Sequence, residues 1–167
     1  MSRLRWLLII CVLLFAWSAS PAAAFMGVDV DAVRKAAEEG NSDAQVELGV
    51  MYSQGLGVPA ADKAEAVKWY EKSAQQGNAT GQYNLGVMYM RGEGVEQDYA
   101  KGREWFRKAA DQGNPAAQFD LAYCLSKGLG GEVDQEGALA LIRKAADQGY
   151  RQARKVLQDY QDGRQPQ

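Results

Sequence analysis

An internal repeat of 36 residues is the feature that most restricts how this chain can fold. Three segments of the 167-residue sequence align, with one extra residue between Gly57 and Trp69 in the first unit. The aligned elements are LGVMY, LGVMY and LAYCL at 48–52, 85–89 and 121–125; GLGV, GEGV and GLGG at 55–58, 92–95 and 128–131; and QGN, QGN and QGY at 76–78, 112–114 and 148–150. A period of this length predicts stacked units, because one unit alone cannot bury its apolar face.

Each unit predicts two helices. The first helix begins after an asparagine, whose side chain accepts hydrogen bonds from the free amides of the first turn, and stops at a left-handed glycine. The second helix begins after an aspartate and ends at another glycine. The predicted first helices lie between Asn41 and Gly55, Asn78 and Gly92, and Asn114 and Gly128; the second lie between Asp62 and Gly77, Asp98 and Gly113, and Asp134 and Gly149.

The repeat also predicts the domain organisation. The units cover about 41–77, 78–113 and 114–149, flanked by helices at 29–40 and 151–162, within one all-α solenoid over 25–162. Residues 163–167 are expected to form a disordered tail. Small residues recur where helices must approach closely, at Ala44, Gly81 and Ala117 and again at Gly49, Gly86 and Ala122.

The N-terminal segment predicts export. Arg3 and Arg5 precede an apolar run at 6–17, and small residues lead to an A-x-A site that ends at Ala24. These are the three parts of a secretory signal peptide, so we expect residues 1–24 to be removed, placing the protein in the periplasm or outside the cell. If the segment is retained, it anchors the chain; after cleavage we expect no stable membrane insertion. The apolar run is short for a membrane span, which needs about 20 residues.

The composition argues against most catalytic and metal chemistry. There is no histidine, which removes the usual general base and the commonest metal ligand. Signal cleavage leaves Cys124 as the single cysteine, which we expect to be a small buried hydrophobe. Removing Arg3 and Arg5 brings the net charge from −2 to −4, and no basic stripe interleaves with aromatic residues, so nucleic acid is not an expected partner.

One short motif superficially suggests a cofactor. Residues 55–60 read GLGVPA and fit G-x-G-x-x-A, a form of the dinucleotide-binding fingerprint. That fingerprint requires a preceding strand and a following helix, whereas here the glycines follow a helix and recur in register with the repeat. We therefore predict no cofactor and no metal, and assign these glycines to turning one helix back onto the next.

The repeat pattern A-x-x-x-L-G-x-x-Y-x-x-G-x-G-V-x-x-D, followed by A-x-x-W-Y-x-K-A-A-x-x-G-N, resembles the SEL-one-like (Sel1-like) repeat family, a close relative of the tetratricopeptide repeats. The resemblance covers about residues 30–160. It implies a right-handed α-solenoid and a role as an adaptor or scaffold in protein complexes rather than as an enzyme. The third unit departs from the pattern at Leu125 and Leu141, where the other units have tyrosine and tryptophan.

The resemblance also suggests which face binds a partner, because the first helices line the concave surface in tetratricopeptide-type solenoids. The outward positions of that face carry aromatic residues, methionine and an arginine, which suit the anchoring of a peptide or a helix. The predicted partner-binding groove is Tyr83, Val87, Met90, Arg91, Phe119 and Tyr123. The alternative is that these rows pack between repeats as core.

The sequence therefore predicts an exported, non-enzymatic, monomeric repeat protein that binds another protein or a peptide as an adaptor or regulator in the cell envelope. An enzyme acting on cell-wall material is an alternative, although no G-x-S-x-G or S-x-x-K motif supports it. A secreted effector that binds host proteins is a third reading. The identity of the partner is not encoded in any motif.

Overall fold

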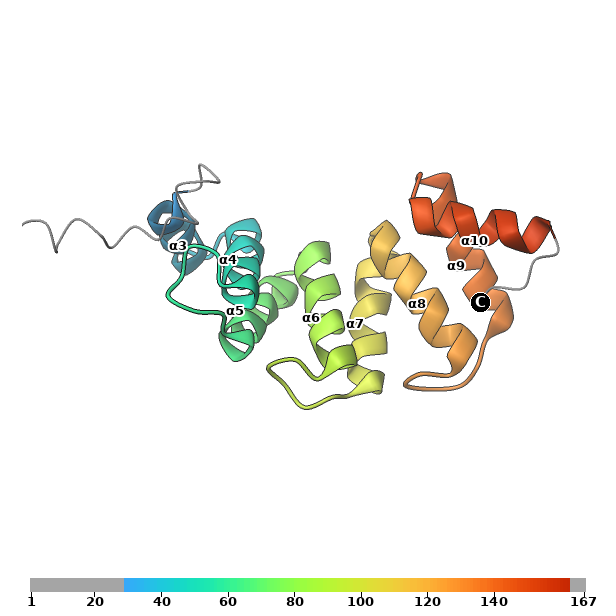
Figure 1. The fold of residues 1–167 in the computed structure, drawn as a ribbon, viewed down its shortest axis with the longest axis horizontal. Helices are drawn as coiled ribbons and strands as arrows, with labels where there is room; N and C mark the ends of the chain where they lie inside the picture. Colours follow the sequence, from blue (N-terminus) through green and yellow to red (C-terminus); the bar gives the residue numbers. More distant parts are fainter. Residues whose placement is uncertain (1–28, 163–167) are drawn as a thin grey trace, which may run out of the picture.

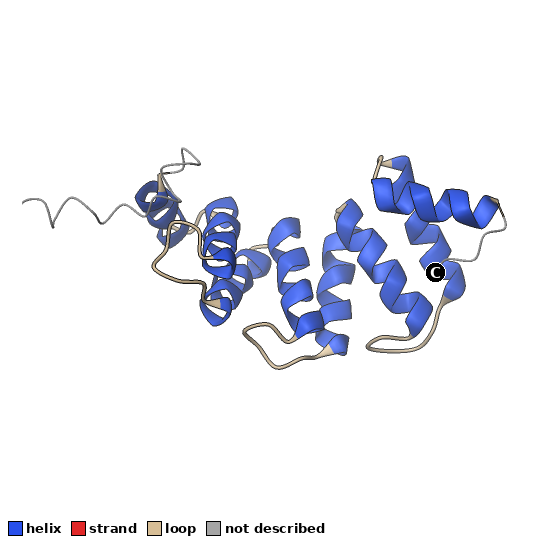
Figure 2. Ribbon diagram, in the orientation of Figure 1, coloured by secondary structure: helices blue, strands red, loops and turns tan. Residues whose placement is uncertain are grey.

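The computed structural model describes residues 29–162, which form eight α-helices and no strand (Figures 1 and 2). The helices are α3 (Val30–Glu38), α4 (Ser42–Gln54), α5 (Lys63–Gln75), α6 (Ala79–Arg91), α7 (Tyr99–Asp111), α8 (Pro115–Lys127), α9 (Gln135–Asp147) and α10 (Arg151–Gln161). The predicted signal peptide at 1–24 and the predicted tail at 163–167 lie outside the described residues. The all-α prediction is confirmed.

The helices stack in sequence order. Each helix packs on the one before it and the one after it, and α4 also contacts α6 directly. The result is a row of helices from α3 at one end to α10 at the other (Figure 1). This is the α-solenoid that the repeat predicts, since contacts form mainly between neighbours along the chain.

The helix boundaries follow the predicted capping residues closely. Asn78 accepts hydrogen bonds at the start of α6, and Asp98 does the same at the start of α7. Gly92 ends α6 in the left-handed conformation, with φ 68°. The second helices are shorter than predicted: α5 ends at Gln75, and Gly77 lies two residues further on, with φ 86°. Gly77 therefore reverses the chain after the helix rather than forming its last residue.

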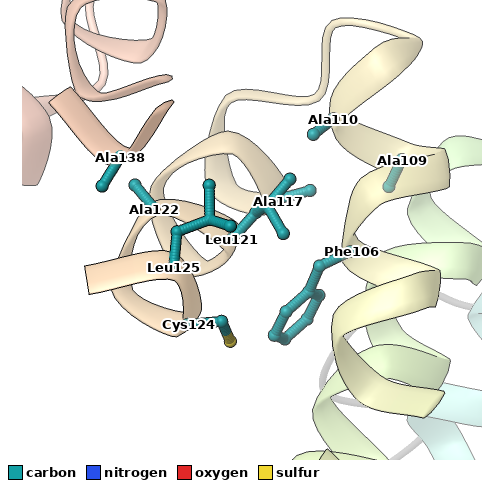
Figure 3. Packing of buried hydrophobic residues seen from close by; sticks show 9 residues of the cluster. All are labelled: Phe106, Ala109, Ala110, Ala117, Leu121, Ala122, Cys124, Leu125 and Ala138. Atoms are coloured by element: carbon teal, nitrogen blue, oxygen red, sulfur yellow. The ribbon is translucent and has the colours of Figure 1, made fainter. Parts of the chain in front are cut away.

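Small residues allow the two helices of a unit to approach closely, as predicted. A Cβ atom at Gly86 would lie 2.6 Å from the ring of Phe106, and one at Gly49 would lie 2.5 Å from the ring of Tyr70. The aromatic rings of the second helices thus occupy the space left by the glycines of the first. Figure 3 shows the core between α7 and α8, where Phe106 points towards Cys124.

The second glycine does more than turn the chain in two of the G-x-G loops. In the loop before α7, a Cβ at Gly94 would collide with the backbone of Lys63 at the start of α5. Gly130 in the next unit meets the backbone of Tyr99 and Ala100 at the start of α7 in the same way. Our sequence interpretation, which gave these glycines only a turning role, was therefore incomplete: Gly94 and Gly130 let their loops touch the preceding repeat.

A ladder of hydrogen-bonded glutamines, three buried and three exposed, joins the helices and was not predicted from the sequence. In each unit a buried glutamine donates from Nε2 to a backbone carbonyl of the preceding helix and accepts from the glutamine at the end of the following helix. The donor-acceptor pairs are Gln45 to Ala37 (3.0 Å), Gln76 to Gln45 (2.7 Å), Gln82 to Ala74 (3.3 Å), Gln112 to Gln82 (2.7 Å), Gln118 to Ala110 (3.3 Å) and Gln148 to Gln118 (2.8 Å). Arg154 takes the place of the next glutamine, donating from Nε to Ala146 O at 3.0 Å.

The ladder leads to a stability prediction. Changing Gln82 to methionine keeps the side-chain length but removes the donor to Ala74 O and the acceptor for Gln112. We expect the free energy of unfolding to fall by about 1–3 kcal/mol, because two hydrogen bonds of a buried side chain are lost and each contributes about 0.5–1.5 kcal/mol. Urea unfolding followed by circular dichroism measures this. The matched control, Gln75→Met, changes an exposed glutamine and should leave the unfolding midpoint nearly unchanged.

Candidate binding site

A hollow of about 260 Å³ opens between α6 and α8, the first helices of two successive repeats. The second helix between them, α7, contributes the ring of Phe106, which is 3% exposed and belongs to the core. The lining residues are Tyr83, Asn84, Val87, Met90 and Arg91 from α6, Phe106 from α7, and Asp120, Tyr123 and Cys124 from α8. The hollow combines an apolar interior with a few polar groups.

The structure brings together five of the six residues predicted for the groove: Tyr83, Val87, Met90, Arg91 and Tyr123. Three of them, Tyr83, Val87 and Met90, are half-buried and also pack against the core. These residues therefore line the hollow and pack between helices at the same time. Tyr123 is 55% exposed, so its ring is accessible from solvent beside the hollow.

The sixth predicted residue, Phe119, is placed elsewhere. Its ring packs on Tyr150 with centroids 5.5 Å apart, at the junction with α10. The other units have Asn78 or Asn114 where this one has Tyr150, so α10 begins without a side-chain cap. The tyrosine at this position instead covers Phe119, which therefore packs between helices.

Four lining residues were missed by the sequence analysis: Asn84, Phe106, Asp120 and Cys124. Asn84 and Asp120 occupy equivalent positions in their repeats, one residue after Tyr83 and Phe119. The aligned polar pair was a usable signal, because a polar residue beside an outward aromatic row must lie at the edge of the same face. Phe106 gave no such signal, because a residue on the second helix of a unit is expected to pack in the core.

Tyr83 joins the two repeats through its hydroxyl. Its Oη donates a hydrogen bond to Oδ2 of Asp120 at 3.1 Å, and its ring stacks on Phe106 with centroids 5.7 Å apart. Burial, followed by the negative charge of Asp120, raises the pKa of the Tyr83 phenol well above its ordinary value. The phenol therefore stays protonated and holds α6 against α8.

Asp120 is a half-buried carboxylate without an ion pair among residues 29–162. Within this range no lysine or arginine nitrogen lies within 4.0 Å of it. Burial raises the pKa of this carboxyl above its ordinary value, while the hydrogen bond from Tyr83 and the charge of Arg91 oppose that effect. Arg91 itself pairs with Glu93, at 3.7 Å.

Cys124 has the character of a packing residue. It is 1% exposed and lies in the core cluster of α7 and α8, as expected for a small buried hydrophobe. Burial, reinforced by the charge of Asp120, raises the pKa of its thiol to about 11, so the reactive thiolate form is disfavoured. Among the described residues, no group of three or more histidine, cysteine, aspartate and glutamate side chains is arranged to hold a metal ion.

The raised pKa of Asp120 predicts a pH-dependent stability difference. At neutral pH the folded state bears the cost of a desolvated charge, and this cost is relieved as the pH falls through the raised pKa towards the unfolded value of about 3.9. We therefore expect Asp120→Asn, which still accepts from Tyr83, to be at least as stable as the wild type at neutral pH. That advantage should shrink on acidification.

Urea unfolding midpoints of both proteins across this pH range measure the effect. Tyr83, Tyr150 and Cys124, which lie near Asp120, stay neutral across this range because their pKa values are raised. A variant markedly less stable than the wild type at neutral pH would contradict this account of Asp120.

Comparison with known proteins identifies the repeat. The model of the Sel1 repeat matches residues 42–78, 79–114 and 115–150, one residue later than the unit boundaries predicted from the sequence. A protective antigen of uropathogenic Escherichia coli with an SLR fold is 44% identical over 74% of this chain, with a TM-score of 0.71. A Sel1 repeat protein from Oxalobacter formigenes is 36% identical over 69% of this chain, with a TM-score of 0.66.

A third structure shares the fold alone. Helicobacter pylori cysteine rich protein B is 21% identical over 78% of this chain and 98% of its own, with a TM-score of 0.61. The chain covers only 26% of the E. coli protein and 47% of the O. formigenes protein. A search of curated protein sequences finds no match. With three family-model matches in register and relatives of this similarity, the chain belongs to the Sel1 repeat family.

Proposed function

We propose that the hollow between α6 and α8 binds a segment of another protein, and that the chain is an exported, non-enzymatic adaptor or regulator in the cell envelope. Sel1 repeat proteins generally mediate protein–protein interactions, and the family is typically a non-catalytic scaffold. The observation that carries the proposal is the exposed ring of Tyr123 beside a hollow with both apolar and polar walls. Aromatic residues and methionine in an apolar centre with polar groups around it are typical of the sites that anchor a protein partner.

The size of the hollow favours a peptide anchor over a whole small molecule. Its volume of about 260 Å³ is below the range of about 300–1,000 Å³ that is usual for small-molecule and cofactor sites. A hollow of this size holds one or two side chains of a protein segment.

Site-specific crosslinking tests the binding site. A photoreactive amino acid replaces Tyr123 in the full chain, expressed in its own cells. Its matched control replaces Tyr160 on α10, which is 62% exposed and lies outside the hollow. We expect a discrete protein adduct from position 123 and none of that size from position 160. Adducts of equal yield at both positions, or none at position 123, would contradict the proposal.

Export is tested separately. The N-terminal pattern at 1–24 supports removal of this segment, so the mature chain should begin at Phe25 and be released with the periplasmic fraction. N-terminal sequencing and cell fractionation measure both. Recovery from the culture medium would instead favour the secreted effector. Of the helices in the described part of the chain, none is long and apolar enough to cross a membrane.

A further inference from the structure

Asp120 provides the hollow with a negative charge that forms no ion pair among residues 29–162. The Tyr83 hydroxyl occupies one acceptor position on Oδ2, whereas an ionised carboxylate has about four. A half-buried charge is costly unless it is paired and hydrogen-bonded. The remaining acceptor positions of Asp120 are therefore suited to a cation that arrives with the partner.

Arg91, which lines the hollow, and two other cations, Lys63 and Arg103, bind other groups. Arg91 lies at the rim and pairs with Glu93 at 3.7 Å, and Lys63 binds the same glutamate at 2.9 Å. Arg103 donates from Nη1 to the backbone oxygen of Glu132 at 3.1 Å. In the described part of the chain, none of these cations forms an ion pair with Asp120.

The walls of the hollow suit a long basic side chain. Val87 and Met90 provide aliphatic surface for the methylene stem, while the head group reaches the carboxylate. The exposed ring of Tyr123 offers a face on which a planar guanidinium can stack. Arginine is favoured over lysine here, because it can bind a carboxylate with two parallel hydrogen bonds and stack on an aromatic ring at the same time.

We propose that this hollow accepts a basic side chain, preferably arginine, from the bound segment, with Asp120 as its counter-ion. The proposal rests on the proposed function of the hollow as a docking site and names the chemistry of the anchor. Asn84 supports it: its amide has no hydrogen-bond partner among residues 29–162 and lines the same hollow, where it can bind the backbone of the segment.

The test uses short capped peptides with a single central residue in a glycine and serine background. The central residue is arginine, its neutral analogue citrulline, or glutamate. Binding is followed by amide chemical shifts of the ¹⁵N-labelled chain 25–167. We expect the arginine peptide to shift the signals of Asn84, Val87, Asp120 and Tyr123, and the citrulline peptide to bind about tenfold more weakly, because it lacks the charge.

Three variants sharpen the result. Asp120→Asn keeps the size of the side chain and should lower affinity for the arginine peptide by about tenfold or more, to that of the citrulline peptide. The matched control, Asp111→Asn, removes an exposed carboxylate at the end of α7 and should leave the affinity unchanged. Arg91→Ala should strengthen binding of the arginine peptide, because a positive charge that competes for Asp120 is removed.

The outcomes separate the two proposals. Equal binding of the arginine and citrulline peptides, or an Asp120→Asn variant that binds like the wild type, would overturn the basic anchor. The basic anchor would also be overturned if the glutamate peptide bound more tightly than the arginine peptide and no longer bound to the Arg91→Ala variant. Each of these results, combined with an adduct from position 123, leaves the docking site in place. The absence of any peptide binding would overturn the basic anchor, and together with no adduct from position 123 it would overturn both proposals.

Discussion

Replacing Gly94 with alanine is expected to lower the free energy of unfolding by about 2–5 kcal/mol. Two costs combine. The residue has φ +71°, and a side chain in this left-handed region costs about 1–2 kcal/mol. The new Cβ would also meet the backbone of Lys63 and Ala64 in the preceding repeat, and relieving such overpacking typically costs about 1–3 kcal/mol. The second cost weakens the interface between neighbouring repeats, on which a solenoid depends.

Gly113→Ala is the matched control for this experiment. Gly113 has φ +90°, but nothing lies within 4 Å of the position a Cβ would take. The Gly113→Ala variant should therefore lose only about 1–2 kcal/mol of unfolding free energy, from the left-handed conformation alone. Urea unfolding of both variants, followed by circular dichroism, measures the difference. Equal losses would show that the contact between the loop and the preceding repeat adds no stability.

Phe106→Ala is expected to cost about 3–5 kcal/mol of unfolding free energy, the range for removing a buried phenylalanine. The ring is 3% exposed, stacks on Tyr83 and fills the space beside Gly86. Its loss leaves a cavity between α6, α7 and α8. It also removes the apolar surface at the base of the hollow, so peptide binding should weaken even where the variant remains folded.

Two further variants separate packing from general sensitivity to mutation. Phe106→Leu keeps most of the volume and should cost less than about 1.5 kcal/mol. Tyr160→Ala removes an exposed ring on α10 and should stay within about 0.5 kcal/mol of the wild type. Thermal and urea unfolding of all three proteins measure the series. A Phe106→Ala protein as stable as Tyr160→Ala would contradict the assignment of Phe106 to the core.

Most of the fold could be predicted because its signals are local. An N-cap such as Asn78 binds amides two and three residues along the chain, and Gly92 ends its helix by its own backbone conformation. The repeat then carries each local signal three times. The error in the ends of the second helices has the same origin: Gly77 marks the reversal of the chain, which follows the last helical residue.

The buried glutamines show what local patterns do not reveal. Gln45, Gln82 and Gln118 recur at the repeat period, but glutamine is usually an exposed residue, so nothing in its pattern predicts burial. Their partners lie on the preceding helix and about 30 residues further along the chain. Only the stacked helices bring the carbonyl and the second glutamine within reach.

The sequence by itself determined the repeat, the caps of its helices and the positions where small residues let the helices pack. Each of these features depends either on residues close together in the chain or on the spacing of the repeat. Only the tertiary structure decided how neighbouring repeats meet. Asp120 and Tyr83 are 37 residues apart, and their hydrogen bond depends on the rotation of α8 against α6. That rotation is set by packing across the whole interface. It places the Asp120 carboxylate, which forms no ion pair within residues 29–162, in the same hollow as Val87 and Met90.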